Sequence, residues 1–409
     1  MEDQKDFSGV FKNLKVADFC WVGVGPSVGR VLADFGATVI RVESATRPDP
    51  LRTMPPFKDN VPGINRSVYG TLLQCNKYSL VLDLNNPQAR EVARRLIAWA
   101  DIMGESFGPG AMKKWNLGYD EAQKINPKIL YYSTCMQGQT GPHKNFKGFG
   151  LHMAALAGFY NIVGWPEREP VGPYGAYSDF VAWLWMRALV LAAVSYQRRT
   201  GRGQYIDLSQ LEATMHFMGP MILEYTVNSR DTQRNGNKDK YSCPHGVFRC
   251  LGNDNWIAIA VEKDEEWDQF CKDMGNPPWC RDLKFSTFVS RKANEEELNK
   301  LIEEWTSQFE AFNLMSQLQS RGIGAGVVLK PSQVYSDPQL NHRPYRVILE
   351  HKEIGSHSYF TTGANFSKTP PRFKKAAPLL GEDTHWVLTE VLKLSEREID
   401  DLVASKALK

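Results

Sequence analysis

The chain up to Cys135 alternates between short apolar runs with strand periodicity and longer runs with helix periodicity. This alternation predicts βαβ units, in which parallel strands form one sheet that is flanked by helices. Ligands of such sheets bind beyond the carboxyl ends of the strands. We therefore expect an α/β, Rossmann-like large domain. Its expected strands are Lys15 to Trp21, Thr38 to Val42, Tyr78 to Leu84 and Lys128 to Cys135.

Helix signals fill the segments between these runs. Pro26 suits the first turn of a helix, because its fixed φ is helical and its missing N–H would be unpaired there. We expect this helix to end at Gly36 and a second helix to open at Asn86 and Pro87. Phe180 to Tyr196 is apolar nearly all round, which predicts a buried central helix.

Two polar segments, Thr226 to Lys240 and the loop-like Pro331 to Pro344, predict domain boundaries. The turn at Gly201 to Gly203 leads into a short strand, Gln204 to Leu208. We expect a large domain over residues 1–225, completed by 345–409, and a smaller α+β domain over residues 226–344.

Composition excludes several classes of protein. The formal net charge of +3 is too small to indicate nucleic acid or a membrane surface as the main partner. No uncharged apolar run reaches the roughly 18 residues of a membrane-spanning helix, since Arg187 interrupts the longest one. Met1 to Lys15 has no apolar core of a signal peptide.

Cysteine and histidine usage indicates a reducing compartment without a metal centre. The 7 cysteines form no CxxC pair, so we expect no disulfide scaffold and a cytoplasmic location. The 8 histidines show no HxxxH or HExxH spacing, and only His245 lies close to a cysteine, Cys243. We expect no metal.

A glycine-rich turn is the first candidate for chemistry. Gly23, Gly25 and Gly29 precede Glu43 in a pattern similar to the dinucleotide fingerprint. The spacing differs by one residue, and Pro26 stands where a phosphate-binding amide would be needed. NAD, another nucleotide-like ligand and a purely structural turn all remain open.

Asp179 is the second candidate, because it lies between the turn Gly172 to Gly175 and the apolar helix. An aspartate there suits an N-cap. The helix N-terminus would also keep the carboxylate ionised, and an ionised carboxylate in apolar surroundings is a competent nucleophile. The third candidate is the loop Gln137 to Pro142, followed by Lys144 and Lys147, which fits either a binding loop or a solvated turn.

Six separated blocks appear in one order along the chain: Gly25 to Glu43, Asn76 to Leu84, Phe107 to Gly110, Gly138 to Pro142, Thr200 to Gln204 and Pro378 to Gly381. Together they resemble the class III CoA-transferases, also called the formyl-CoA transferase or CaiB–BaiF family. The resemblance extends from Phe11 to Leu402.

This resemblance implies an interlocked dimer whose Rossmann-like domain binds CoA. It makes Asp179 the nucleophile of a covalent relay through an aspartyl anhydride and an aspartyl–CoA thioester. CoA is then a substrate, and no permanent cofactor is needed. The resemblance also implies CoA contacts at Val22, Gly23, Val24, Arg41, Leu82, Asp83, Leu84, Asn85, Ser106, Lys114 and Lys147.

The chain departs from formyl-CoA transferase at several site positions. Gly23, Gly150 and Ser106 replace a glutamine, a glutamate and an asparagine, and Arg234 to Asn237 is the nearest feature to a mobile run of glycines. Formate and oxalate are therefore disfavoured, and the two glycines favour a larger acid, such as an aromatic one. The pattern is most similar to succinyl-CoA:benzylsuccinate CoA-transferase subunits, which implies a homodimer or a heterodimer with a paralogous subunit.

Two alternatives within the same resemblance stay open. A 2-methylacyl-CoA racemase needs a histidine at the position of Phe149, which cannot exchange a proton. A CoA-binding subunit without turnover would keep the fold and lack the reaction.

Overall fold

The computed structural model describes residues 9–343 and 345–409. The chain divides into two compact units. The first contains the chain up to Tyr160, Gly172–Thr232 and Arg343–Lys409, and the second contains Asn161–Val171 and Gln233–His342. The short segment Asn161–Val171 therefore belongs to the smaller unit, which the sequence did not indicate. Residues 1–8, part of the segment in which no signal-peptide core was expected, and Pro344 at the expected return boundary lie outside the described residues.

The first unit is built on a six-stranded sheet with the order β3-β2-β1-β4-β5-β6, and every pairing in it is parallel. The strands are β1 (Lys15–Phe19), β2 (Thr38–Glu43), β3 (Tyr78–Val81), β4 (Ile102–Glu105), β5 (Leu130–Cys135) and β6 (Gln204–Ser209). The order reverses between β1 and β4, which opens a crevice beyond their carboxyl ends. The α/β fold is confirmed. The prediction missed β4, because a four-residue strand that contains Gly104 has almost no periodic signal.

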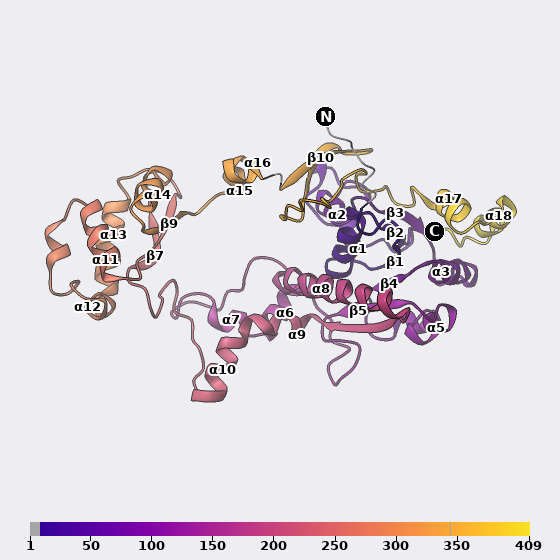
Figure 1. The fold of residues 1–409 in the computed structure, drawn as a ribbon, viewed down its shortest axis with the longest axis horizontal. Helices are drawn as coiled ribbons and strands as arrows, with labels where there is room; N and C mark the ends of the chain where they lie inside the picture. Colours follow the sequence, from indigo (N-terminus) through magenta and orange to yellow (C-terminus); the bar gives the residue numbers. More distant parts are fainter. Residues whose placement is uncertain (1–8, 344) are drawn as a thin grey trace. The chain divides into compact units, whose positions relative to one another are not determined.

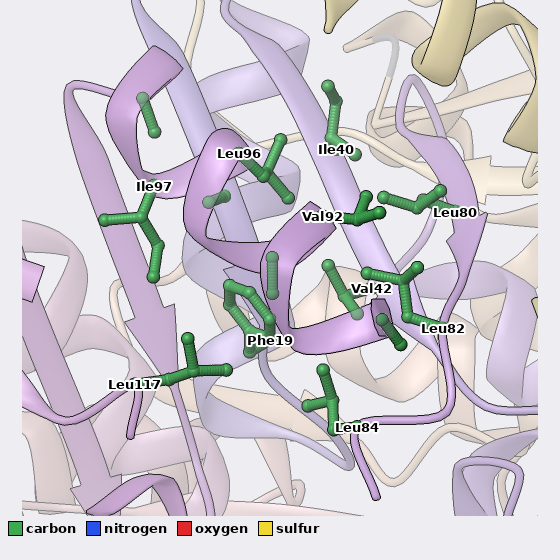
Figure 2. Close-up of a cluster of buried hydrophobic side chains, with 14 of the residues drawn as sticks. Phe19, Ile40, Val42, Leu80, Leu82, Leu84, Val92, Leu96, Ile97 and Leu117 are labelled. Carbon is green, nitrogen blue, oxygen red and sulfur yellow. The ribbon is translucent and has the colours of Figure 1, made fainter. Parts of the chain in front are cut away.

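Helices cover both faces of this sheet (Figure 1). On one face, α3 (Pro87–Trp99) and α5 (Tyr119–Ile125) pack against alternate strand residues such as Ile40, Val42 and Leu80 (Figure 2). On the other face, α1 (Val24–Asp34) and α8 (Tyr177–Thr200) pack against Val16 and Val39. Alternation along each strand thus divides the core into two clusters.

Helix α8 was predicted to be buried all round, but only one side of it is buried. Val181, Ala182 and Met186 are buried, whereas Leu184 on the opposite side is 55% exposed. The complete helix is longer than the apolar run seen in the sequence, and it meets the length and hydropathy of a membrane-spanning segment. The core helix of a globular protein meets the same criteria, so this finding does not contradict the expectation that no segment spans a membrane.

The rest of the first unit consists of short helices and one hairpin. These elements are α2 (Val68–Leu72), α4 (Ala111–Lys114), α6 (Gly150–Leu156), α9 (Gln210–Met215), α10 (Gly219–Asn228), β10 (Arg346–His351), β11 (Gly355–Phe360), α17 (Thr384–Trp386) and α18 (Glu396–Ala404). The returning C-terminal segment is fixed to the sheet, because Asp383 accepts a hydrogen bond from Ser79 N–H at 2.9 Å.

The second unit has an antiparallel three-stranded sheet with the order β7-β8-β9. Its elements are β7 (His245–Arg249), β8 (Trp256–Ala260), α11 (Asp264–Asp273), α12 (Phe288–Ala293), α13 (Glu295–Thr306), α14 (Ala311–Ser320), β9 (Gly324–Val327), α15 (Pro331–Ser336) and α16 (Pro338–His342), and α7 (Phe159–Ile162) leads into it. The segment expected as loop from Pro331 onward contains α15 and α16, because each proline sits at a helix start where its ring is tolerated.

Candidate active site

Two cavities of the first unit lie beyond the carboxyl ends of β1 to β5. The larger has a volume of about 800 Å³ and the smaller about 290 Å³. They are neighbours, because five residues line both: Trp21, Gly108, Pro109, Phe146 and Lys147. The larger cavity also has three cationic side chains, those of Arg47, Arg90 and Lys114. This arrangement suits a long anionic ligand whose far end reaches the smaller cavity.

Most residues with predicted CoA contacts line these cavities. Leu82 to Asn85 and Lys114 line the larger cavity, Val22 to Val24 and Ser106 line the smaller one, and Lys147 lines both. The sequence analysis missed Arg47 and Arg90. Arg47 follows the end of β2, which is a position where α/β sheets commonly bind ligands.

Arg41 is the exception among the predicted contacts. It is 1% exposed and lines neither of the two cavities. Its guanidinium forms ion pairs with Glu43 at 3.3 Å and with Asp49. The prediction of a CoA contact was wrong because Arg41 lies inside strand β2, where its charge is neutralised within the fold.

Asp179 is buried beside the smaller cavity without a partner. It is 8% exposed, and its Oδ1 atom has no hydrogen-bond partner among the described residues. The residue lies in the first turn of α8, whose N-cap is Ala176, so the N-cap interpretation was wrong. Burial raises the pKa of Asp179 to about 7, although the helix N-terminus had been expected to keep the carboxylate ionised.

Two glycines lie directly against Asp179. A Cβ atom at Gly150 would lie 2.9 Å from Cγ of Asp179, whereas one at Gly23 would lie 3.4 Å from its Oδ2. The space beside Gly150 is therefore filled by the carboxylate itself. This contradicts the expectation that a glycine at position 150 leaves room for a bulkier acid.

The start of α1 lines the same cavity. Gly23 and Val24 line it, and the N-terminus of α1 has no side-chain cap. Val22 has a φ of 62°, which is rare for a β-branched residue. Its N–H donates to both oxygens of Asp49 at 3.2 Å, and Ser106 Oγ accepts from Trp21 N–H at 2.7 Å. Asp49 and Ser106 thus fix the loop that leads into α1.

The remaining glycines of the turn serve packing. A Cβ atom at Gly29 would lie 2.7 Å from Oδ2 of Asp18, so the glycine permits close approach of α1 to β1. Glu43, the acid in the dinucleotide pattern, is 1% exposed and bound by Arg52 at 2.7 Å. These contacts favour the structural interpretation of the motif over a dinucleotide site.

Within residues 9–343 and 345–409, no group of three or more His, Cys, Asp or Glu side chains is arranged to hold a metal ion. All 7 cysteines are free and buried. Phe149 is 56% exposed and lines the smaller cavity, at the position where a racemase would need an acid–base group.

Comparison with known proteins decides the family. Residues 11–384 match the model of CoA-transferase family III. The chain belongs to this family. It is 28% identical to the succinyl-CoA–D-citramalate CoA-transferase of Chloroflexus aurantiacus, over 94% of each chain. It is 29% identical to the succinate–glutarate CoA-transferase of Agrobacterium fabrum, over 96% of this chain and 98% of the relative.

The fold agrees with this assignment. A CaiB/BaiF family protein from Brucella suis superposes with a TM-score of 0.86 at 27% identity, over 94% of this chain and all of that one. The chain is thus a CoA-transferase that exchanges CoA between an acyl-CoA and a carboxylic acid.

Proposed function

We propose that this CoA-transferase moves CoA from succinyl-CoA to an aliphatic dicarboxylic acid, with Asp179 as the covalent carrier. The observation that carries the proposal is the buried carboxylate of Asp179, whose Oδ1 has no hydrogen-bond partner among the described residues and which lines the smaller of two neighbouring cavities. A carboxylate without hydrogen bonds keeps its lone pairs for attack on a carbonyl.

The larger cavity would hold the nucleotide part of CoA. Arg47, Arg90, Lys114 and Lys147 bring positive charge to the phosphates. Leu82 to Asn85 supply the wall at the end of β3. The pantetheine arm then follows the residues shared by the two cavities, which brings the thioester to Asp179.

The reaction is a series of acyl substitutions. Ionised Asp179 attacks the carbonyl carbon of succinyl-CoA; a C–O bond forms, the C–S bond breaks, and CoA leaves as a thiolate. The thiolate attacks Cγ of the mixed anhydride, which forms aspartyl–CoA and releases succinate. The acceptor carboxylate then attacks the same Cγ and releases the thiolate. Thiolate attack on the acceptor's acyl carbon yields the new CoA ester and free Asp179.

Each substitution develops an oxyanion that needs preorganised donors. The uncapped start of α1 offers backbone N–H groups at Gly23 and Val24, and this helix end is electropositive. These amides would take the place of the glutamine that Gly23 replaces. Loop fixation by Asp49 and Ser106 keeps them in position before the reaction starts.

The two relatives support an aliphatic acceptor, since their names give D-citramalate and glutarate. The filled space at Gly150 removes one argument for a larger, aromatic acid such as benzylsuccinate. Lys144, which is exposed and lines only the smaller cavity, suits the second carboxylate of a diacid.

We also propose that the chain pairs with a second copy of itself. Apolar side chains remain exposed along α8 and α10, including Leu184 and Leu189 on α8 and Leu223 and Val227 on α10. Exposed apolar patches of this kind mark protein interfaces. A homodimer sediments at about twice 46.3 kDa, whereas a chain that needs a paralogous subunit stays at that mass.

Trapping tests the covalent step. The chain is incubated with succinyl-CoA, treated with hydroxylamine, and digested for mass spectrometry; we expect a hydroxamate on Asp179. Asp179→Asn should show no adduct and lose at least about 10³-fold of the transfer rate. Glu297→Gln, which removes a carboxylate at the surface of the second unit, serves as the control and should still be labelled at Asp179. Full transfer by Asp179→Asn would end the proposal.

A further inference from the structure

The loop Gln137 to Pro142, predicted to be either a binding loop or a solvated turn, leads toward the two cavities. It follows β5 and precedes Phe146 and Lys147, which line both cavities. Gly108 and Pro109, which also line both, come shortly after β4. Four of the five residues common to the two cavities therefore lie on two chain segments, one after each of two neighbouring strands.

Gln139 joins these two segments. Its Nε2 donates to the carbonyl of Phe107 at 3.3 Å and to Oε1 of Glu105 at 3.3 Å. A carboxamide NH₂ has two N–H donors, which is enough for both acceptors. Phe107 directly precedes Gly108 and Pro109. The loop after β5 is thus connected, through one side chain, to the segment after β4 that lines both cavities.

Glu105 completes the fixation of Phe107. It lies at the end of β4 and is 3% exposed, and its Oε2 accepts from Phe107 N–H at 2.8 Å. Its Oε1 accepts from Ser133 Oγ as well as from Gln139. Both backbone polar groups of Phe107 are therefore held by side chains, the N–H by Glu105 and the carbonyl by Gln139. A buried polar network whose members are paired in this way makes the structure around it rigid.

The polar residues that hold Gln139 form one row across the sheet. Glu105 in β4 lies opposite Ser133 in β5, and Ser133 lies opposite Asp207 in β6. Asp207 accepts from Gln139 N–H with both carboxylate oxygens, at 2.9 and 3.1 Å. The main chain and the side chain of Gln139 are both tied to the sheet, which is the support expected of a residue that keeps a site in shape before a ligand binds.

The position of Gln139 indicates an indirect role. It lines neither of the two cavities, and its side-chain nitrogen already donates to Glu105 and Phe107. Any effect of Gln139 on a ligand must therefore be transmitted through the main chain of the two segments that it joins.

We propose that Gln139 is a positioning residue for CoA transfer, which fixes the two segments along the pantetheine arm so that the thioester reaches Asp179. This inference rests on the proposed function of the Asp179 cavity. The phosphates are assigned to Arg47, Arg90, Lys114 and Lys147, so the nucleotide part of CoA should bind without Gln139. The reaction should not tolerate its loss, because a displacement of about 1 Å at the reacting atoms can reduce a rate about 100-fold.

The first measurement separates positioning from binding. Gln139→Leu nearly keeps the size and removes both side-chain donors. We expect kcat for the exchange of labelled succinate into succinyl-CoA to fall about tenfold or more, and hydroxamate formation on Asp179 to slow by the same factor. The dissociation constant of 3′-phospho-ADP, the nucleotide part of CoA, should stay within about twofold of the wild-type value. Gln308→Leu is the control with an expected wild-type kcat, because Gln308 donates to the carbonyl of Glu304 in the second unit.

The second measurement uses the anchor of the Gln139 main chain. Asp207 is exposed, so its substitution should leave the core intact. Asp207→Ala removes the acceptor of Gln139 N–H and should lower kcat about threefold to tenfold, which is the effect of one hydrogen bond. Asp207→Asn keeps an acceptor oxygen and should retain most of the wild-type kcat. If Gln139→Leu does not fold, this pair of variants decides.

The outcomes distinguish this inference from the proposed function. Unchanged kcat in Gln139→Leu and Asp207→Ala would overturn the inference, while a wild type that exchanges succinate and is labelled at Asp179 keeps the proposed function. A parallel loss of kcat and of 3′-phospho-ADP affinity would also overturn the inference, because Gln139 would then maintain the whole CoA site. A wild-type chain that exchanges no succinate and forms no adduct at Asp179 contradicts the proposed function itself.

Discussion

Glu43 and Asp179 are both buried carboxylates of the first unit, and their surroundings are opposite. Glu43 forms an ion pair with Arg52 at 2.7 Å and accepts a hydrogen bond from Ser79 Oγ at 2.7 Å. Burial alone would raise its pKa, but Arg41 and Arg52 lower it to about 2. No cation among the described residues offsets the burial of Asp179, and burial raises its pKa to about 7.

This difference indicates which role, structural or catalytic, each carboxylate can serve. The charge of Glu43 is neutralised by neighbours that would be destabilised without it, so its role is structural. Asp179 destabilises the fold whenever it is ionised, because nothing compensates for its lost hydration. Proteins retain such a group where function needs it.

The largest effect that this comparison predicts is a loss of folding stability when Glu43 is substituted. Glu43→Gln leaves the shape nearly unchanged and removes the charge that neutralises two buried guanidinium groups. We expect unfolding by urea to show a loss of about 3–5 kcal/mol. The same substitution at Glu297, which pairs with Lys284 at the surface, should change stability by at most about 1 kcal/mol.

Asp179→Asn is the matched change at the unpartnered carboxylate, and its effect on stability should have the opposite sign. From about pH 4 to 7 the folded chain keeps a proton that the unfolded chain releases, so ionisation lowers stability as the pH rises through this range. Asp179→Asn should therefore be more stable than the wild type by roughly 1–3 kcal/mol at pH 8. The gain should shrink toward pH 4, and a loss of stability at pH 8 would contradict the comparison.

Substitutions at the two glycines beside Asp179 test how strongly catalysis depends on the position of its carboxylate. Gly150→Ala places a methyl group 2.9 Å from Cγ of Asp179 and 2.9 Å from Ala176, so the carboxylate must move. We expect kcat to fall by roughly 10- to 100-fold, since a displacement of about 1 Å has that effect at an active site. Gly23→Ala brings an ordinary contact of 3.4 Å and should reduce kcat much less. Equal kcat for the two variants would show that Gly150 does not hold Asp179 in place.

Local patterns were sufficient for much of the fold. The alternation in Thr38 to Val42 predicts β2, and Asn86 caps α3 by accepting from Gln88 N–H. Both signals lie within a few neighbouring residues. Helix α8 was placed correctly by its apolar run, but its exposed side was not predicted, because apolar composition alone does not show which side chains the rest of the fold covers.

The site was predictable only in part for the same reason. Asp179 was identifiable from its place before an apolar helix and from the family resemblance. The contacts of Gly23 and Gly150 with it join residues far apart in the chain. The position of Arg41 within β2 was the signal against a ligand contact.

The smallest predicted effect concerns pH. The value of kcat/KM reports ionisations of the free enzyme, and attack on the thioester requires ionised Asp179. With a pKa of about 7, roughly one tenth of the carboxyl groups are ionised at pH 6, so kcat/KM should be about tenfold below its plateau, reached near pH 8. An aspartate with its ordinary pKa of 3.8 would give a flat profile across this range.

The phosphate of CoA also titrates near pH 6. The measurement is therefore repeated with an ester of dephospho-CoA, whose profile should keep the same midpoint. A midpoint that moves with the phosphate would assign the titration to the substrate, and the contrast between Glu43 and Asp179 would then not govern catalysis.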